Sequence, residues 1–245
     1  MIDELKFSIY VMGFIFLGTT LGGWITKYIS SNLKVNNLYI NVFCGGLLIG
    51  LIGFDLLPET LQYLNPIGVY AGISLGVIFM EIIDRLVHKT KHRYKEEIES
   101  FILLFIALFI HSIPTGVALG MNLQKPILNH SFLIAAIVLH HIPEGVIMMA
   151  SILHSKMKLK IFWFFCFILS FAVGLNTFWG IELKIQSVKF YTLLSGAAIG
   201  TLSYVSFYEI LWKHSLALPL IKVVMTTLLG VILMKMFTIF MPMIH

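Results

Sequence analysis

Long apolar stretches separated by short polar connections run along nearly the whole chain. Eight stretches approach or exceed the roughly 20 residues that a helix needs to cross the hydrocarbon core of a bilayer. They cover residues 7–29, 38–63, 66–87, 101–123, 131–153, 160–180, 188–212 and 217–241. One longer polar loop, residues 88–100, separates the third and fourth stretches. The pattern predicts an all-α, polytopic membrane protein with eight transmembrane helices, in which residues 1–245 form a single transmembrane domain.

Composition supports this pattern and excludes several classes of protein. Hydrophobic residues make up 58% of the chain and charged residues 12%, against about 45–50% and 25% in ordinary soluble domains. We therefore exclude a cytosolic enzyme, a nucleic-acid-binding module and a disulfide-built secreted domain. Cys44 and Cys166 both lie inside apolar stretches and are interpreted as packing residues. Asp3 and Glu4, rather than a basic region, precede the first stretch, so we expect a retained helix and not a signal peptide.

The basic residues predict the orientation of the helices. The four connections after the first, third, fifth and seventh stretches, together with the ends of the stretches beside them, carry most of the 17 Lys and Arg residues. These residues are Lys27, Lys34, Arg85, Lys89, Lys91, Arg93, Lys95, Lys156, Lys158, Lys160 and Lys213. Because cytoplasmic loops carry the excess of basic residues, we expect both termini to lie outside.

A spaced motif occurs twice at a constant offset. It consists of Gly46, Gly50 and Glu59 in the second stretch and of Gly196, Gly200 and Glu209 in the seventh. The second and seventh helices cross in opposite directions, which predicts an inverted repeat in a 3+2+3 arrangement of helices. Such repeats around a midplane site are a transporter architecture. The alternative interpretation is ordinary glycine packing, since small residues at this spacing are common between membrane helices.

The fourth and fifth stretches carry a second duplicated motif. Residues 111–117 read HSIPTGV and residues 140–146 read HHIPEGV. Ionisable side chains inside spanning helices are costly and are usually functional. His111, His140, His141 and Glu144 combine imidazole with carboxylate, which suits Zn²⁺ and also Fe²⁺, Mn²⁺, Co²⁺ or Cd²⁺. The two motifs therefore predict a divalent-metal site between these helices.

Each motif also contains a proline, Pro114 or Pro143. A proline inside a helix removes a backbone donor and kinks the helix. Irregular backbone at membrane depth is tolerated where it is buried or lines a cavity. The prolines therefore favour a transport site over a closed structural site.

These motifs resemble those of the ZIP (Zrt-, Irt-like protein) family of divalent-metal transporters. Further similarities are LLPE at residues 56–59, IDRL at 83–86 and GLNTFWG at 174–180. The resemblance implies a single transmembrane transporter domain in the cell membrane, with eight spans and both termini outside. It also implies that His111, His140, His141 and Glu144 form the main transport site.

The sequence departs from the family pattern at three positions. Ser112 stands where many members have Asn, and Thr115 and Thr177 stand where acidic residues are expected around a second metal. Two adjacent dications need several carboxylates to offset their repulsion. We therefore expect a mononuclear site.

Three further acids are expected along the metal pathway. Asp55 and Glu59 are one turn apart near the predicted outer mouth and are interpreted as entrance carboxylates, the alternative being a pair satisfied by water or Lys. Glu209 is the expected counterpart at the cytoplasmic exit. His88 and His92 belong to the polar loop, which is interpreted as a solvated, topology-setting segment.

The leading prediction is a transporter that imports a divalent cation, most simply Zn²⁺, with Fe²⁺, Mn²⁺ or Cd²⁺ as alternatives. The metal is its substrate, and we expect no catalytic cofactor and no enzyme activity. The expected partners are the metal ions and the lipid bilayer, without nucleic acid, and a homodimer is left open. The alternative is an intramembrane zinc-dependent hydrolase with Glu144 as its base, which the absence of H-E-x-x-H disfavours. A metal sensor without transport is disfavoured by the absence of a soluble output domain.

Overall fold

The predicted all-α architecture is confirmed. The computed structural model describes residues 2–33, 37–89, 96–122, 130–182, 188–213 and 218–240, and these residues form helices and no strand. In chain order the elements are α1 (Ile2–Leu33), α2 (Asn37–Leu51), η1 (Ile52–Leu56), α3 (Leu57–Tyr63), α4 (Pro66–Lys89), α5 (Glu96–Asn122), α6 (His130–His154), α7 (Leu159–Glu182), α8 (Val188–Tyr204), η2 (Val205–Trp212) and α10 (Leu220–Phe240).

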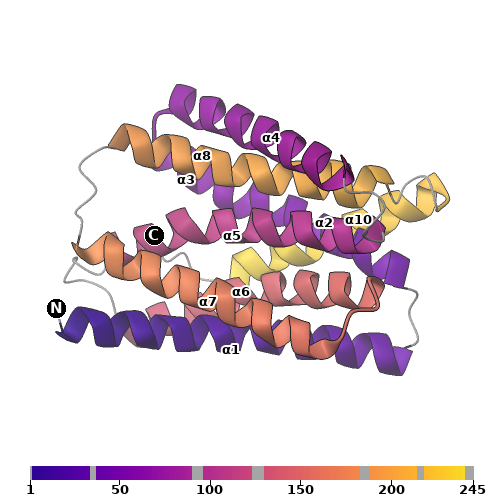
Figure 1. Cartoon of the computed structure of the whole chain (residues 1–245), viewed down its shortest axis with the longest axis horizontal. Coiled ribbons are helices and arrows are strands. Elements are labelled where there is room, and N and C mark those ends of the chain that lie inside the picture. The colour runs from indigo at the N-terminus through magenta and orange to yellow at the C-terminus, as the bar shows by residue number, and fades with distance from the viewer. Residues whose placement is uncertain are drawn as a thin grey trace.

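These elements make eight helical runs, because α2, η1 and α3 are continuous and η2 continues α8. Both η1 and η2 are π-helical, a geometry that occurs mostly as short bulges at functional sites. In the described part of the chain, seven runs are long and apolar enough to cross a bilayer, and α6 adds a further helix of 25 residues. The runs lie with their long axes roughly aligned (Figure 1). The chain is therefore a multi-pass membrane protein.

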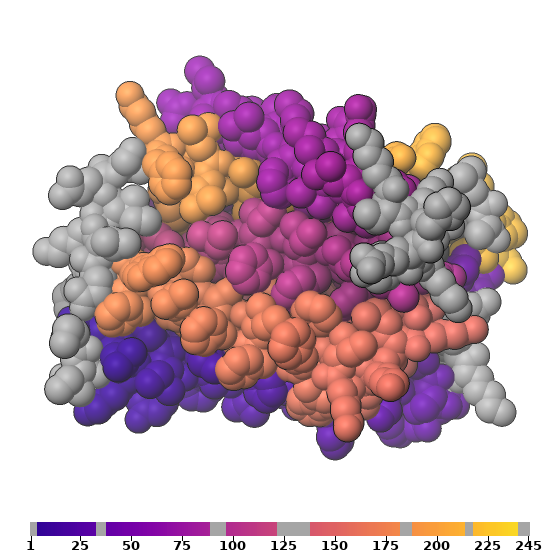
Figure 2. All heavy atoms as spheres, in the orientation of Figure 1, coloured from indigo at the N-terminus to yellow at the C-terminus, as the bar shows by residue number. Residues whose placement is uncertain are grey.

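The outer surface of the bundle suits contact with lipid. Large apolar side chains are exposed along the helices, among them Trp24, Ile67 and Leu220, at 68–80% of their surface. Figure 2 shows one face of the bundle, on which side chains of α4, α5, α7 and α1 lie in successive bands. A soluble protein rarely exposes so much contiguous apolar surface. In a bilayer this surface contacts hydrocarbon without cost.

Four parallel helix pairs form the bundle, and glycine brings the two backbones together in each. A Cβ atom on Gly46 of α2 would lie 2.2 Å from the carbonyl oxygen of Thr227 in α10, and one on Gly196 of α8 would lie 2.3 Å from that of Val69 in α4. The pairs are α1 with α6, α5 with α7, α4 with α8, and α2 with α10. The glycines of the repeated motif therefore have the same task in both copies, the close helix packing that small residues permit in membranes.

The pairing follows the predicted inverted repeat. The repeat matches the first three helical runs, in order, with the last three, and α5 with α6. Under this match α1 corresponds to α7 and α6 to α5, so the α1–α6 pair corresponds to the α7–α5 pair. In the same way, the α4–α8 pair corresponds to the α10–α2 pair. Two groups of four helices result, one of α1, α5, α6 and α7 and the other of α2, α4, α8 and α10. Contacts of α5 with α8 and of α2 with α6 join them. Cys44 and Cys166 are buried free thiols, which confirms their interpretation as packing residues.

Candidate metal centre

The two proline-containing motifs come together inside the bundle, on α5 and α6. One ligand atom from each of His111, His140 and Glu144 lies within 4.8 Å of the other two. His111 and Glu144 are each 4% exposed, whereas His140 is partly buried. We call these three residues the central cluster. Its one carboxylate and two imidazoles are the donor types that bind Zn²⁺ and related cations.

Two atoms of the central cluster are buried without a hydrogen-bond partner among the described residues: Nε2 of His140 and Oε1 of Glu144. The Nε2 atom of His111 lies 3.9 Å from the same Glu144 oxygen. Buried polar side-chain atoms are satisfied in the large majority of cases. Two such atoms on neighbouring ligands therefore indicate a place for a cation.

His141 lies against the opposite oxygen of the same carboxylate. Its Nδ1 atom is 2.9 Å from Oε2 of Glu144, and its ring is nearly perpendicular to that of His140, at 84°. His141 therefore contacts the central cluster through Glu144. It is not one of the three residues whose ligand atoms lie close to one another. The sequence predicted that all four residues lie together. It did not distinguish the three mutually close residues from His141, which contacts the carboxylate of Glu144.

Asp55 also reaches the central cluster, from the π-helical segment η1. Its Oδ2 atom lies 3.3 Å from Nδ1 of His140. Glu59, one turn further along, is on α3 and partly buried. Sequence reasoning grouped Asp55 with Glu59 as entrance residues and did not foresee the contact with His140. No local pattern reveals it, since the two residues are 85 positions apart and meet only through helix packing.

The three hydroxyl-bearing positions of the motifs bond to their own helices. Ser112 donates to the carbonyl of Phe109, and Thr177 on α7 donates to that of Val173 at 2.8 Å. Thr115 donates to the carbonyl of His111 at 2.9 Å, and its oxygen is 3.4 Å from Nε2 of that residue. None of these three side chains adds a carboxylate to the site.

Both motifs have the same spacing of proline and glycine, and these residues lie where the two helices of the site pack on their neighbours. Pro114 and Pro143 both lie inside helices and are buried. At Gly145, a Cβ atom would lie 1.9 Å from the carbonyl oxygen of Thr19 in α1. At Gly116, it would lie 2.7 Å from that of Val173 in α7. Both helices of the site are thus packed backbone to backbone on a neighbour.

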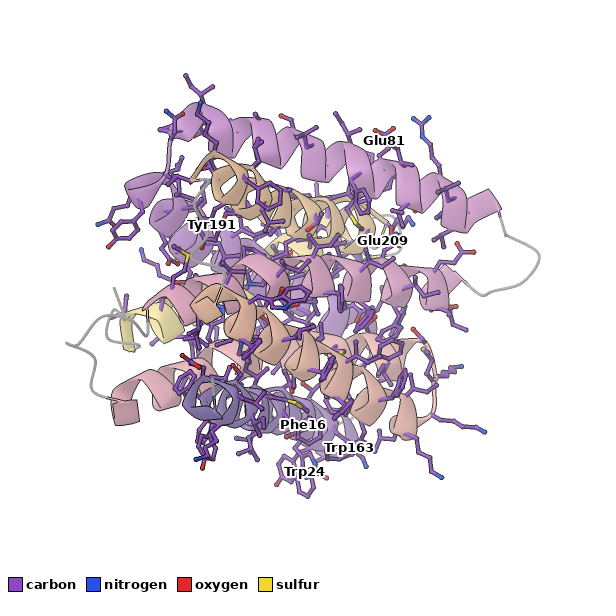
Figure 3. The ribbon with its side chains drawn as sticks, turned by 60° about the vertical axis from the view of Figure 1, so that its left-hand side comes forward. Phe16, Trp24, Glu81, Trp163, Tyr191 and Glu209 are labelled. Carbon is purple, nitrogen blue, oxygen red and sulfur yellow. The ribbon has the colours of Figure 1, made fainter. Side chains whose placement is uncertain are left out.

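Glu209 lies apart from the central cluster, on η2, and is fully buried. Lys213 approaches both of its oxygens, at 2.6 and 2.8 Å, and Ser100 of α5 donates a hydrogen bond to it. Figure 3 shows Glu209 among the helices, whereas Glu81 projects from α4 at the edge of the bundle. His88 contacts Asp84 and Glu99, and the loop residue His92 lies outside the described residues.

Comparison with known proteins gives a family match. A family model described as ZIP Zinc transporter matches residues 95–238, which is more than half of the chain. The match spans both proline-containing motifs and the second copy of the glycine motif, but not Asp55. No curated protein matches the chain.

Proposed function

The chain belongs to the ZIP zinc transporter family, and we propose that it imports Zn²⁺ into the cytoplasm through the central cluster of His111, His140 and Glu144. Divalent-metal transport is the activity of the family. The choice of zinc, the direction of transport and the residues of the site are the content of the proposal. It is supported above all by the two buried ligand atoms, His140 Nε2 and Glu144 Oε1, that lack a hydrogen-bond partner in the described part of the chain.

In this proposal His111 and His140 bind the cation as neutral imidazoles, and Glu144 neutralises part of its charge. His141 holds Oε2 of Glu144 and leaves Oε1 to the metal, so it supports the site through the carboxylate. One metal occupies the site. The hydroxyls of Thr115 and Thr177 support this stoichiometry, because they bond to their own helices and leave a second dication without a carboxylate of its own.

Transport requires that the site open alternately to the two sides of the membrane. We place the chain in the cell membrane with both termini outside, so that metal enters past Glu59 and Asp55 and leaves toward Glu209. Movement of the group α1, α5, α6 and α7 against the other four helices changes the side from which the central cluster is reached. The division of the bundle into these two groups supports this mechanism.

Uptake of radioactive zinc into proteoliposomes tests the proposal. The wild-type protein should accumulate zinc, and His140→Ala and Glu144→Ala should abolish accumulation without loss of folded protein. Glu81→Ala is the matched control, because Glu81 is exposed on α4 and pairs with Arg85 on the same helix. Undiminished uptake by both site variants would refute the site.

Competition by Fe²⁺, Mn²⁺ and Cd²⁺ in the same assay tests the choice of metal. We expect Zn²⁺ and Cd²⁺ to compete most strongly, since imidazole-containing sites favour borderline cations over hard ones. Stronger competition by Mn²⁺ than by Cd²⁺ would overturn the assignment of zinc. Accessibility of terminal tags in intact cells tests the orientation, and tags reached only after permeabilisation would reverse it.

A further inference from the structure

Asp55 and His140 make a contact that the proposed transport function does not itself require. We infer that Asp55 is a positioning residue: its carboxylate holds the imidazole of His140 with Nδ1 protonated and Nε2 directed to the metal. The inference rests on the proposed function, because it concerns how one ligand of that site is prepared for binding.

The chemistry of the two side chains supports this role. Oδ2 of Asp55 lies 3.3 Å from Nδ1 of His140. An ionised carboxylate only accepts hydrogen bonds, so the imidazole nitrogen that faces it carries the proton. A neutral imidazole has a single N–H, and its other nitrogen is then a lone-pair donor. That nitrogen, Nε2, is the buried atom for which the described residues supply no hydrogen-bond partner.

The carboxylate of Glu144 is prepared in a corresponding way. His141 contacts Oε2 at 2.9 Å, and Oε1 is the second buried atom left without a hydrogen bond within the described residues. His140 and Glu144, the two proposed ligands on α6, are therefore each in contact with a neighbour through one atom, Nδ1 or Oε2. The other atom, Nε2 or Oε1, is left to bind the metal. Metal-binding histidines generally have such an outer partner, which fixes the tautomer and the ring orientation.

The two residues belong to different groups of helices. Asp55 lies on η1, in the run that packs on α10, and His140 lies on α6, which packs on α1. Displacement of one group along the other separates Asp55 from His140 and removes the orienting contact. Asp55 therefore orients the imidazole of His140 in the present arrangement of the two helix groups, and a shift of one group would end this effect.

Nitrogen-15 NMR of the metal-free, histidine-labelled full-length protein tests the tautomer directly, with the His140 signals assigned by their loss in His140→Ala. At mildly alkaline pH we expect wild-type His140 to be protonated at Nδ1. In Asp55→Ala we expect the proton to move to Nε2, the nitrogen that free histidine prefers to protonate, whereas Glu81→Ala should retain the wild-type spectrum. Protonation of His140 at Nε2 in the wild type, or an unchanged tautomer in Asp55→Ala, would overturn the inference.

Zinc titration calorimetry of the same proteins tests the consequence for binding. Asp55→Ala should raise the Kd for Zn²⁺ by about 10–100-fold, the usual cost of losing an outer partner. Asp55→Asn should lose less, because its amide oxygen still accepts from Nδ1. If Asp55→Ala does not fold, Asp55→Leu, which also lacks an acceptor, replaces it in both experiments. Glu81→Ala should stay within about twofold, as expected for an exposed site.

The outcomes separate this inference from the proposed function. A Kd of Asp55→Ala within twofold of the wild-type value would refute the positioning role while leaving the metal site intact. An equal loss in Asp55→Ala and Asp55→Asn would also refute it, because charge alone would then explain the effect. Absence of zinc binding by the wild-type protein, with the Nδ1-protonated tautomer present, would refute the proposed function instead.

Discussion

Among the buried glutamates of the described residues, Glu144 and Glu209 have different surroundings. Glu209 on η2 is fully buried, and Lys213 and Ser100 contact its carboxylate. Glu144 on α6 is 4% exposed, and the ion pairs that it makes with described residues are with the imidazoles of His111 and His141. A buried carboxylate requires a compensating charge. The protein supplies an ammonium group to Glu209, whereas our proposal assigns to Glu144 a cation from outside.

Two histidines show the same difference. His88 uses both ring nitrogens: Nδ1 lies 2.9 Å from Oδ1 of Asp84, and Nε2 lies 3.6 Å from Oε2 of Glu99. Nδ1 of His140 faces Asp55, and Nε2 has no hydrogen-bond partner among the described residues. The two histidines therefore differ in whether the described residues contact one or both of their ring nitrogens.

The same substitution at the two glutamates should separate their roles most strongly. Glu144→Gln should weaken zinc binding by roughly 100- to 1,000-fold, because a binding free energy of about 10–16 kcal/mol is shared among three or four ligands. Glu209→Gln should leave zinc affinity within about threefold, since Glu209 already has a cationic partner. Isothermal titration of both variants measures the difference. Equal losses at the two sites would show that Glu209 also binds the metal tightly.

Lys213→Met should destabilise the protein while leaving zinc affinity unchanged. Removing one partner of a buried ion pair costs about 3 kcal/mol or more, which lowers the melting temperature by roughly 6–12 °C in a chain of this size. Thermal unfolding in detergent measures this change. The double variant Lys213→Met/Glu209→Gln should recover much of the loss, because the unpaired charge is removed. A single variant as stable as the wild type would mean that Lys213 does not compensate Glu209.

The sequence was sufficient to predict the eight helices and the pairing of the two motifs, because both follow from local patterns. Runs of apolar residues define the spans, and the matching motifs place His111 and His140 at corresponding positions on neighbouring helices, with Glu144 one turn after His140. The roles of Asp55 and His141 did not follow, because they depend on which nitrogen or oxygen faces which neighbour. The π-helical segment η1, which sets the direction of Asp55, likewise has no distinct signature in the sequence.

Glycine contacts in the two groups of helices, at Gly145 on α6 and Gly200 on α8, offer a smaller test of the same contrast. A Cβ atom would lie 1.9 Å from a carbonyl oxygen of α1 at Gly145 and 2.2 Å from one of α4 at Gly200. Alanine at either position should cost about 1–3 kcal/mol through overpacking. Only Gly145→Ala should also weaken zinc binding, because it displaces the residue next to Glu144. Gly13→Ala, where the added atom meets nothing within 4 Å, is the control for both stability and binding.

Thr115→Val should have the smallest effect on zinc binding, although Thr115 lies directly beside the central cluster. Its hydroxyl donates to the carbonyl of His111 at 2.9 Å and remains 3.4 Å from Nε2 of that residue. A hydroxyl engaged with its own helix should contribute little to a metal that, in our proposal, His111, His140 and Glu144 bind. We therefore expect a Kd within about threefold of the wild-type value and an unchanged stoichiometry of one zinc per chain, since valine has a similar shape and the lost hydrogen bond is worth about 1 kcal/mol in stability. A tenfold loss of affinity in calorimetry would instead indicate that the Thr115 oxygen binds the metal. The hydroxyl of Thr115 would then contact the bound cation directly, as the hydroxyl of Ser100 contacts the carboxylate of Glu209.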